Sequence, residues 1–122
     1  MSGRQQIDKA IGAHGLWKSR LREAIDTGES DFTAAVVKTD NSCDFGQWLH
    51  NTITLDLKAT PQYRTILSHH AEFHMEAARI LQMALAGKKA DADACLSAAS
   101  RFSAISAALT TAMMEWKRTI PE

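Results

Sequence analysis

The sequence predicts an all-α fold: an antiparallel four-helix bundle with an additional short segment before the Cys-bearing helix. Four segments repeat apolar residues at the three- and four-residue spacing of an amphipathic helix. No alternating run of apolar and polar residues indicates a pair of strands. The links between the four segments are short, as is typical of antiparallel helices in a bundle.

The first predicted helix covers about residues 5–27. One face is defined by the spacing of Ile7, Ile11, His14, Leu21 and Ile25, with Trp17 at its shoulder. Lys18 occupies one step of this stripe, so the face is imperfect there. Gly28 follows the last residue of the pattern, where a glycine commonly ends a helix.

The second predicted helix covers about residues 43–54, and its apolar face consists of Phe45, Trp48, Leu49 and Ile53. Residues 29–42 before it are the least regular part of the chain, and a short helix and an extended segment are both compatible with their pattern. The turn at residues 40–42 offers side-chain acceptors for the start of the following helix.

The third and fourth predicted helices are the longest. Thr60 followed by Pro61 marks the start of the third helix, which extends to about Ala86 and ends at Gly87. The fourth is predicted as one helix over about residues 90–117. Its apolar stripe consists of Cys95, Ala99, Phe102, Ser106, Leu109, Met113 and Trp116.

Composition narrows the class of protein. The 122 residues fit one domain, residues 1–122 with a core at about 5–118. Fourteen basic and fourteen acidic residues give no net charge, which argues against a nucleic-acid or membrane partner. No apolar stretch is long enough to span a bilayer, and the N-terminus lacks the apolar region of a secretory signal. The two cysteines are therefore expected to be thiols in a cytoplasmic protein.

Three histidines lie on faces that should be apolar: His14 on the first helix, and His70 and His74 on the third. A single buried histidine is most often a core residue with satisfied hydrogen bonds. Three of them on inward faces need several polar partners, which weakens that interpretation. The spacing of His70 and His74 places them one turn apart, where two imidazoles can share one ion.

Cys43 strengthens the indication of a metal site. It stands where the second helix is predicted to begin, and a helix N-terminus favours the thiolate over the thiol. One thiolate and three neutral imidazoles suit Zn²⁺, which takes four ligands in a closed tetrahedral site. Copper(II) would also bind such donors tightly. A diiron site is less favoured because no inward carboxylates are evident on these helices.

The stretch Cys43-Asp44-Phe45-Gly46-Gln47-Trp48-Leu49 resembles the Cys-x-Phe-Gly-x-Trp-Leu signature of the chemoreceptor zinc-binding domain family. An earlier Ala13-His14-x-x-Trp17 and a later His70-x-x-x-His74 match that family's order of three histidines and one cysteine. The resemblance extends from about Ile7 to Trp116. It implies that His14, Cys43, His70 and His74 bind zinc in a helical, often dimeric, bacterial regulatory domain.

The resemblance also implies a function. Domains of this family are usually joined to chemoreceptor signalling regions or to diguanylate cyclases. No such output region is recognisable here, so we expect either a free-standing member that acts on a partner or an excised domain. Three functions stay open: sensing of zinc availability, sensing of an oxidant such as hypochlorous acid through the Cys43 thiolate, and dimerisation around a structural zinc. An enzyme is not expected, because four protein ligands leave no open position for a substrate.

Three other residues with metal-binding side chains are expected to lie outside the site. His69 points about 100° away from His70 around the helix, and His50 follows the cysteine motif and is expected to be exposed. Cys95 fits the stripe of the fourth helix and is expected to be a packed thiol. Gly46 is expected to permit close packing beside the metal, because glycine inside a helix otherwise costs about 1 kcal/mol.

Overall fold

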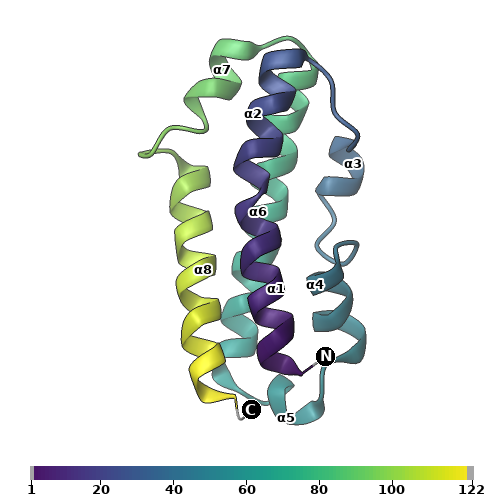
Figure 1. Cartoon of the computed structure of the whole chain (residues 1–122), viewed down its shortest axis with the longest axis vertical. Helices are drawn as coiled ribbons and strands as arrows, with labels where there is room; N and C mark the ends of the chain where they lie inside the picture. Colours follow the sequence, from purple (N-terminus) through teal and green to yellow (C-terminus); the bar gives the residue numbers. More distant parts are fainter. Residues whose placement is uncertain (1, 121–122) are drawn as a thin grey trace.

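The computed structural model describes residues 2–120 and contains helices but no strand over that range, which confirms the predicted all-α class (Figure 1). Residues 1, 121 and 122 of the predicted domain lie outside the described part. No described helix has the length and apolar character required to cross a membrane. The elements are α1 (Gly3–Gly15), α2 (Trp17–Thr27), α3 (Ala34–Val37), α4 (Asp44–Gln47), the π-helix η1 (Trp48–Thr52), α5 (Leu55–Lys58), α6 (Pro61–Leu85), α7 (Lys89–Ala94) and α8 (Arg101–Thr119).

Helix α6 is the element around which the others pack. It contacts α8 and α7, and also α2 and α3, while α1 contacts both α8 and α4. Figure 1 shows α1 and α2 as one nearly continuous column, with α8 on one side and the short helices α3 and α4 on the other. The bundle therefore has three long columns, and short helical pieces stand where the second predicted helix was expected.

The first predicted helix is broken at Leu16, so the prediction of one helix over residues 5–27 was wrong at this point. The Leu16 N–H donates to the carbonyl of Ala13, three residues back, so one turn is tighter than an α-helix. Gly15, which has low helix propensity, directly precedes the break. Gly28 ends α2 with φ 74°, in agreement with the predicted C-terminal glycine.

The fourth predicted helix was also wrong as a single element, because α7 and α8 are separated by residues 95–100. Ser100 is the N-cap of α8, and its side chain accepts a hydrogen bond from the N–H of Ser103. The Ser103 hydroxyl donates to the carbonyl of Ser97, which closes the connection. Ala99, predicted to be on the apolar stripe, is exposed as a result, whereas Cys95 is half-buried against the core.

The third predicted helix is confirmed, with Thr60 as N-cap, Pro61 as first residue and Gly87 at φ 79° beyond its end. The Thr60 hydroxyl does not cap α6; it donates to Leu57 and accepts from the indole N–H of Trp116. The irregular residues 29–42 contain the short helix α3, capped by the side chain of Thr33. Helix α5 was not predicted.

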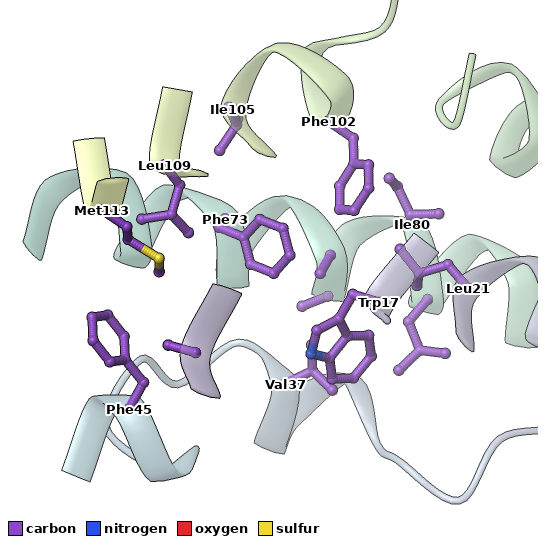
Figure 2. Close-up of a cluster of buried hydrophobic side chains, with 14 of the residues drawn as sticks. Trp17, Leu21, Val37, Phe45, Phe73, Ile80, Phe102, Ile105, Leu109 and Met113 are labelled. Carbon is purple, nitrogen blue, oxygen red and sulfur yellow. The ribbon is translucent and has the colours of Figure 1, made fainter. Parts of the chain in front are cut away.

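The hydrophobic core lies between α6 and α8 and extends to α2, α3 and α4. Figure 2 shows side chains of α8 facing Phe73 and Ile80 of α6, and the rings of Phe73 and Phe102 lie 5.4 Å apart. Trp116, Leu21 and Leu49 are among the fully buried side chains. The core includes most residues of the four predicted faces. Within residues 2–120, four polar side chains are buried with it: His14, His70, His74 and Glu76.

Candidate metal centre

The structure brings one sulfur and three imidazole groups together in the bundle. One donor atom from each of His14, Cys43, His70 and His74 lies within 4.8 Å of each of the others. The Nε2 atom of His70 lies 3.1 Å from Nε2 of His14 and 3.0 Å from Nε2 of His74. The Sγ atom of Cys43 lies 3.4 Å from Nε2 of His70 and 3.5 Å from Nε2 of His74. The four predicted residues thus share one centre.

His14 reaches this centre from the last turn of α1. Its Nδ1 lies 2.8 Å from the carbonyl oxygen of Ala10, one turn earlier, so the N–H on Nδ1 donates to the backbone. The other ring nitrogen, Nε2, therefore carries the lone pair and points toward the other donors. The side chain is 7% exposed. The backbone of α1 fixes both the ring orientation and the tautomer.

His70 and His74 reach the centre from consecutive turns of α6. Nδ1 of His74 donates to the carbonyl oxygen of Val37 in α3 at 2.9 Å, which again leaves Nε2 as the donor atom. Nδ1 of His70 is buried and has no hydrogen-bond partner among residues 2–120. His70 is therefore held by packing and by its neighbours in the centre rather than by the backbone.

Cys43 is the N-cap of α4, and its sulfur accepts a hydrogen bond from the N–H of Gly46 at 3.3 Å. This confirms the predicted position at a helix start, where the backbone N–H groups favour negative charge on sulfur. Asp44, in the first turn, is exposed and pairs with Lys9 at 3.3 Å. Its carboxylate acts as a helix-start charge and contacts none of the four donor residues.

Gly46 is required by the turn that precedes Cys43. A Cβ atom at this position would lie 1.9 Å from the carbonyl oxygen of Asp40 and 3.0 Å from Cα of Asn41. Both neighbours are backbone atoms, so no rotamer change relieves the clash. The turn at residues 40–42 can therefore pack on α4, and Cys43 can face α6, only with glycine at position 46.

Aromatic rings enclose the centre. Phe45 presents its ring edge-on to His14 at 5.9 Å and to His70 at 5.3 Å, and it stacks on Trp48 at 5.8 Å. Phe73 lies edge-on to His14 at 5.2 Å. These rings are buried and exclude water from the polar cluster on the core side.

Burial sets the protonation of the four groups. It lowers the pKa of His14 to about 4 and that of His70 to about 2, where the neighbouring imidazoles act in the same direction. Burial also lowers the pKa of His74, although the Val37 hydrogen bond and the charge of Asp40 each act to raise it. The pKa of the Cys43 thiol is raised by burial, against the hydrogen bond from Gly46. At neutral pH the imidazoles are therefore neutral and available as ligands.

The donor set fits a tetrahedral metal ion. Bonds of about 2.0–2.3 Å to nitrogen and sulfur give tetrahedral edges of roughly 3.3–3.6 Å. Four of the six donor separations lie between 3.0 and 3.5 Å, and the other two are within 4.8 Å. Converging lone pairs repel one another unless a proton or a cation lies among them. Three imidazoles with a thiolate match the ligand preference of Zn²⁺, and Cu²⁺ shares part of it.

The structure keeps the other candidate donors away from the centre. His50 is exposed and lies 3.4 Å from the carboxylate of Asp40, and His69 is half-exposed on α6. Cys95 lies beside Arg79, whose guanidinium donates to the sulfur at 3.5 Å. These positions agree with the predictions for all three residues.

Sequence reasoning missed two parts of the site, the backbone carbonyls that hold the histidines. The Ala10 carbonyl is four residues before His14, so helical geometry alone could have indicated it. The Val37 carbonyl lies on a separate short helix and gives no side-chain signal.

Comparison with known proteins agrees with the geometry. The profile of the family described as "chemoreceptor zinc-binding domain" matches residues 14–81, a range that contains all four donor residues. Neither the curated proteins nor the solved structures compared with the chain gave a match.

Proposed function

Because the chain belongs to the chemoreceptor zinc-binding domain family, we propose that it is a sensory module whose single Zn²⁺ is bound by His14, Cys43, His70 and His74. The convergence of three Nε2 atoms and one sulfur atom in a largely buried centre carries this proposal. A closed set of four protein ligands has no position for a substrate, which favours regulation over catalysis.

The proposed signal is a change in helix packing that follows zinc occupancy. The ligands come from the end of α1, from the start of α4 and from the middle of α6. Zinc would therefore tie together three elements that are otherwise joined mainly by packing and by the exposed Lys9–Asp44 ion pair between α1 and α4. The proposed receiver is a chemotaxis signalling region or a diguanylate cyclase, either in the same polypeptide or in a partner.

A second candidate function is oxidant sensing, and the exposure of Cys43 favours it. Its side chain is half-buried rather than fully enclosed, and it lines a surface cavity of about 350 Å³ together with His14 and His74. A small oxidant can reach the sulfur by this route. Oxidation of the thiolate to sulfenic acid would remove the one anionic ligand and weaken the site.

The proposed assembly is a homodimer in the cytoplasm. Members of the family often dimerise, and a closed twofold pair is the usual form of a soluble homo-oligomer. The reducing cytoplasm would keep the two free cysteines as thiols. Sedimentation velocity of the purified chain at micromolar concentration tests the assembly, and a monomer at every concentration contradicts it.

Zinc titration of matched cysteine variants tests the proposed ligands. Cys43→Ala removes the anionic ligand and should weaken zinc binding by about two orders of magnitude or more, about 3 kcal/mol. Cys95→Ala removes a half-buried thiol elsewhere and should leave the affinity within about twofold. A wild-type chain that retains no zinc after exposure to it, or equal affinities in the two variants, contradicts the assignment.

Affinity and oxidant treatment then separate the two functions. A sensor of zinc availability must release and rebind the ion at the free concentrations that a cell reaches. An oxidant sensor holds zinc throughout that range and releases it on treatment with hypochlorous acid. Chelator competition, with and without the oxidant, distinguishes these behaviours on the same sample.

A further inference from the structure

The cavity beside the metal centre has the character of a small-molecule site. Its volume is about 350 Å³, at the lower end of the range for ligand pockets of about 300–1,000 Å³. One wall is formed by α1 and the start of α2, and the other by the irregular segment that leads to Cys43. The lining is mostly apolar and includes Ala13, Trp17, Phe32, Val36, Val37 and Phe45.

Figure 2 shows Trp17 and Val37 on the same side of the core, and both side chains line this cavity. Their own burial is nearly complete, at 7% and 3% exposure. At the mouth, Phe32 and Val36 are 37% and 55% exposed. The cavity therefore has a fixed inner part and an outer part with apolar side chains that face water.

A cation without a carboxylate partner stands at the edge of this apolar cavity. The Arg20 guanidinium lies 5.1 Å from the centre of the Trp17 ring and 5.0 Å from the centre of the Phe32 ring. No ion pair joins it to a carboxylate among residues 2–120. The second cation of the lining, Lys9, is already paired with Asp44.

The acidic residues near Arg20 belong to a different depression. Glu23, Glu29 and Asp31 line a second surface pocket, to which Arg20 and Phe32 also belong. Among residues 2–120, no ion pair joins any of these three carboxylates to the Arg20 guanidinium. A planar guanidinium held against aromatic rings presents donors that match a carboxylate. The apolar lining matches an aromatic or branched hydrocarbon body.

We propose that the cavity between α1, the start of α2 and residues 32–45 binds a small aromatic or branched carboxylate, whose apolar body packs on Trp17, Phe32 and Val36 and whose anionic group pairs with Arg20. The proposed site adjoins the metal centre, because His14, Cys43 and His74 line the same cavity. The proposed contacts of the carboxylate are none of these three metal ligands. The proposal of this carboxylate site does not depend on whether the protein senses zinc or an oxidant.

Titration of the zinc-loaded chain with 3-phenylpropionate tests the site by two-dimensional NMR. We expect saturable shifts at the amides of Ala13, Phe32 and Val36, with a dissociation constant on the order of 100 µM. The neutral isostere 3-phenylpropanamide should bind at least about tenfold more weakly, because it leaves Arg20 without an anion. The absence of saturation at these amides, or equal affinity for acid and amide, overturns the proposal.

Matched variants assign the site. Val36→Trp places an indole in the cavity mouth and should weaken the probe by at least about tenfold. Ala35→Trp, on the neighbouring exposed position of α3 outside the cavity lining, should leave it unchanged. Arg20→Gln should abolish the preference for the acid, whereas Lys18→Gln should keep it. Equal affinity in the two tryptophan variants contradicts the assigned cavity, and the zinc content of each variant reports separately on the metal centre.

Discussion

The imidazole of His74 donates its Nδ1–H to the carbonyl oxygen of Val37, at 2.9 Å, in the short helix that precedes the Cys43 turn. This bond orients the candidate ligand His74. The segment that accepts it also supplies the candidate ligand Cys43. The stretch from α3 to α4 is therefore tied to α6 at two points, by the Val37 carbonyl and by the Cys43 sulfur. The 40–42 turn packs on Gly46, and Asp44 pairs with Lys9 of α1, which also hold this stretch in place.

Removal of zinc should loosen residues 34–47 selectively. Without a metal ion, Cys43 and His74 lose their common partner, and the segment is held by packing, the Val37 hydrogen bond and the exposed Asp44–Lys9 ion pair. Hydrogen–deuterium exchange measured before and after chelation should show faster exchange in this stretch and little change in the centre of α6. Uniform loss of protection over the whole chain would show instead that zinc stabilises the entire fold.

His70→Ala should weaken zinc binding by about two orders of magnitude, about 3 kcal/mol. The Nε2 atom of His70 lies closest to the other donors, within 3.1 Å of two of them. His69→Ala is the matched control, because this neighbour lies on the same helix but outside the centre. Competition with a chromophoric chelator measures both affinities. A comparable loss in His69→Ala would mean that the mutations act through α6 rather than through a ligand.

Gly46→Ala should destabilise the protein by about 1–3 kcal/mol and weaken zinc binding with it. The added methyl group would lie 1.9 Å from the Asp40 carbonyl oxygen, so either the turn or α4 must move, and Cys43 moves with them. Urea unfolding and zinc titration measure the two effects. Gly12→Ala is the control, because no atom lies within 4 Å of its added Cβ. This helix substitution should be neutral or stabilising by up to about 1 kcal/mol.

The sequence predicted the metal centre more completely than the helices around it. The positions of His70 and His74 follow from one helical turn, and the cysteine motif lies within one short segment. Whether a predicted helix is continuous was harder to predict, because local side-chain hydrogen bonds compete with helix propensity, as at the break between α7 and α8. Ser97 and Ser100 sit in an alanine-rich stretch with good helix propensity, so the periodicity predicted a single helix. The side chains of Ser100 and Ser103 instead form a cap and a turn there.

The supporting contacts of the site could not be predicted because they join distant backbone segments. The approach of Asp40 to Gly46 and the bond from His74 to Val37 arise from how the irregular segment folds onto α6. Every residue has a backbone carbonyl, so the residue type does not indicate which carbonyl accepts a hydrogen bond. The glycine alone carried a usable signal, since its position inside a predicted helix indicated a close approach.

The zinc-free protein should lose stability as the pH falls below about 6.5. Burial lowers the pKa of His14 to about 4 and that of His70 to about 2, so the unfolded chain binds more protons than the folded chain from pH 6.5 down to those values. Each such histidine costs about 2 kcal/mol of unfolding free energy at pH 5. Urea unfolding of the chelated protein at pH 7.5 and pH 5 measures the change.

The matched variants for this test are His70→Met and His69→Gln. His70→Met removes one buried imidazole, so the loss of unfolding free energy between pH 7.5 and pH 5 should be smaller by the contribution of one histidine. His69→Gln changes a half-exposed residue and should leave most of that loss unchanged. If the zinc-free chain is equally stable at pH 7.5 and pH 5, the three imidazoles are not buried as neutral groups.

Zinc binding should release about one proton per ion between pH 6 and pH 8, and that proton should come from Cys43. Burial raises the pKa of this thiol in the metal-free site, so it is protonated at pH 7, and the metal must displace the proton to bind the thiolate. The lowered pKa values of His14 and His70 mean that these imidazoles are already neutral and release none. Unperturbed imidazoles with a pKa of about 6.5 would release roughly two more protons at pH 6.

Calorimetry in buffers of different ionisation enthalpy counts the protons directly. Cys43→Ala should reduce the count to nearly zero, and Cys95→Ala should leave it at one. The affinity of the wild type should accordingly rise about tenfold for each pH unit over this range, since one proton competes with one metal ion. A count near three at pH 6 would place the histidines in water before zinc arrives and would contradict the buried, preformed centre.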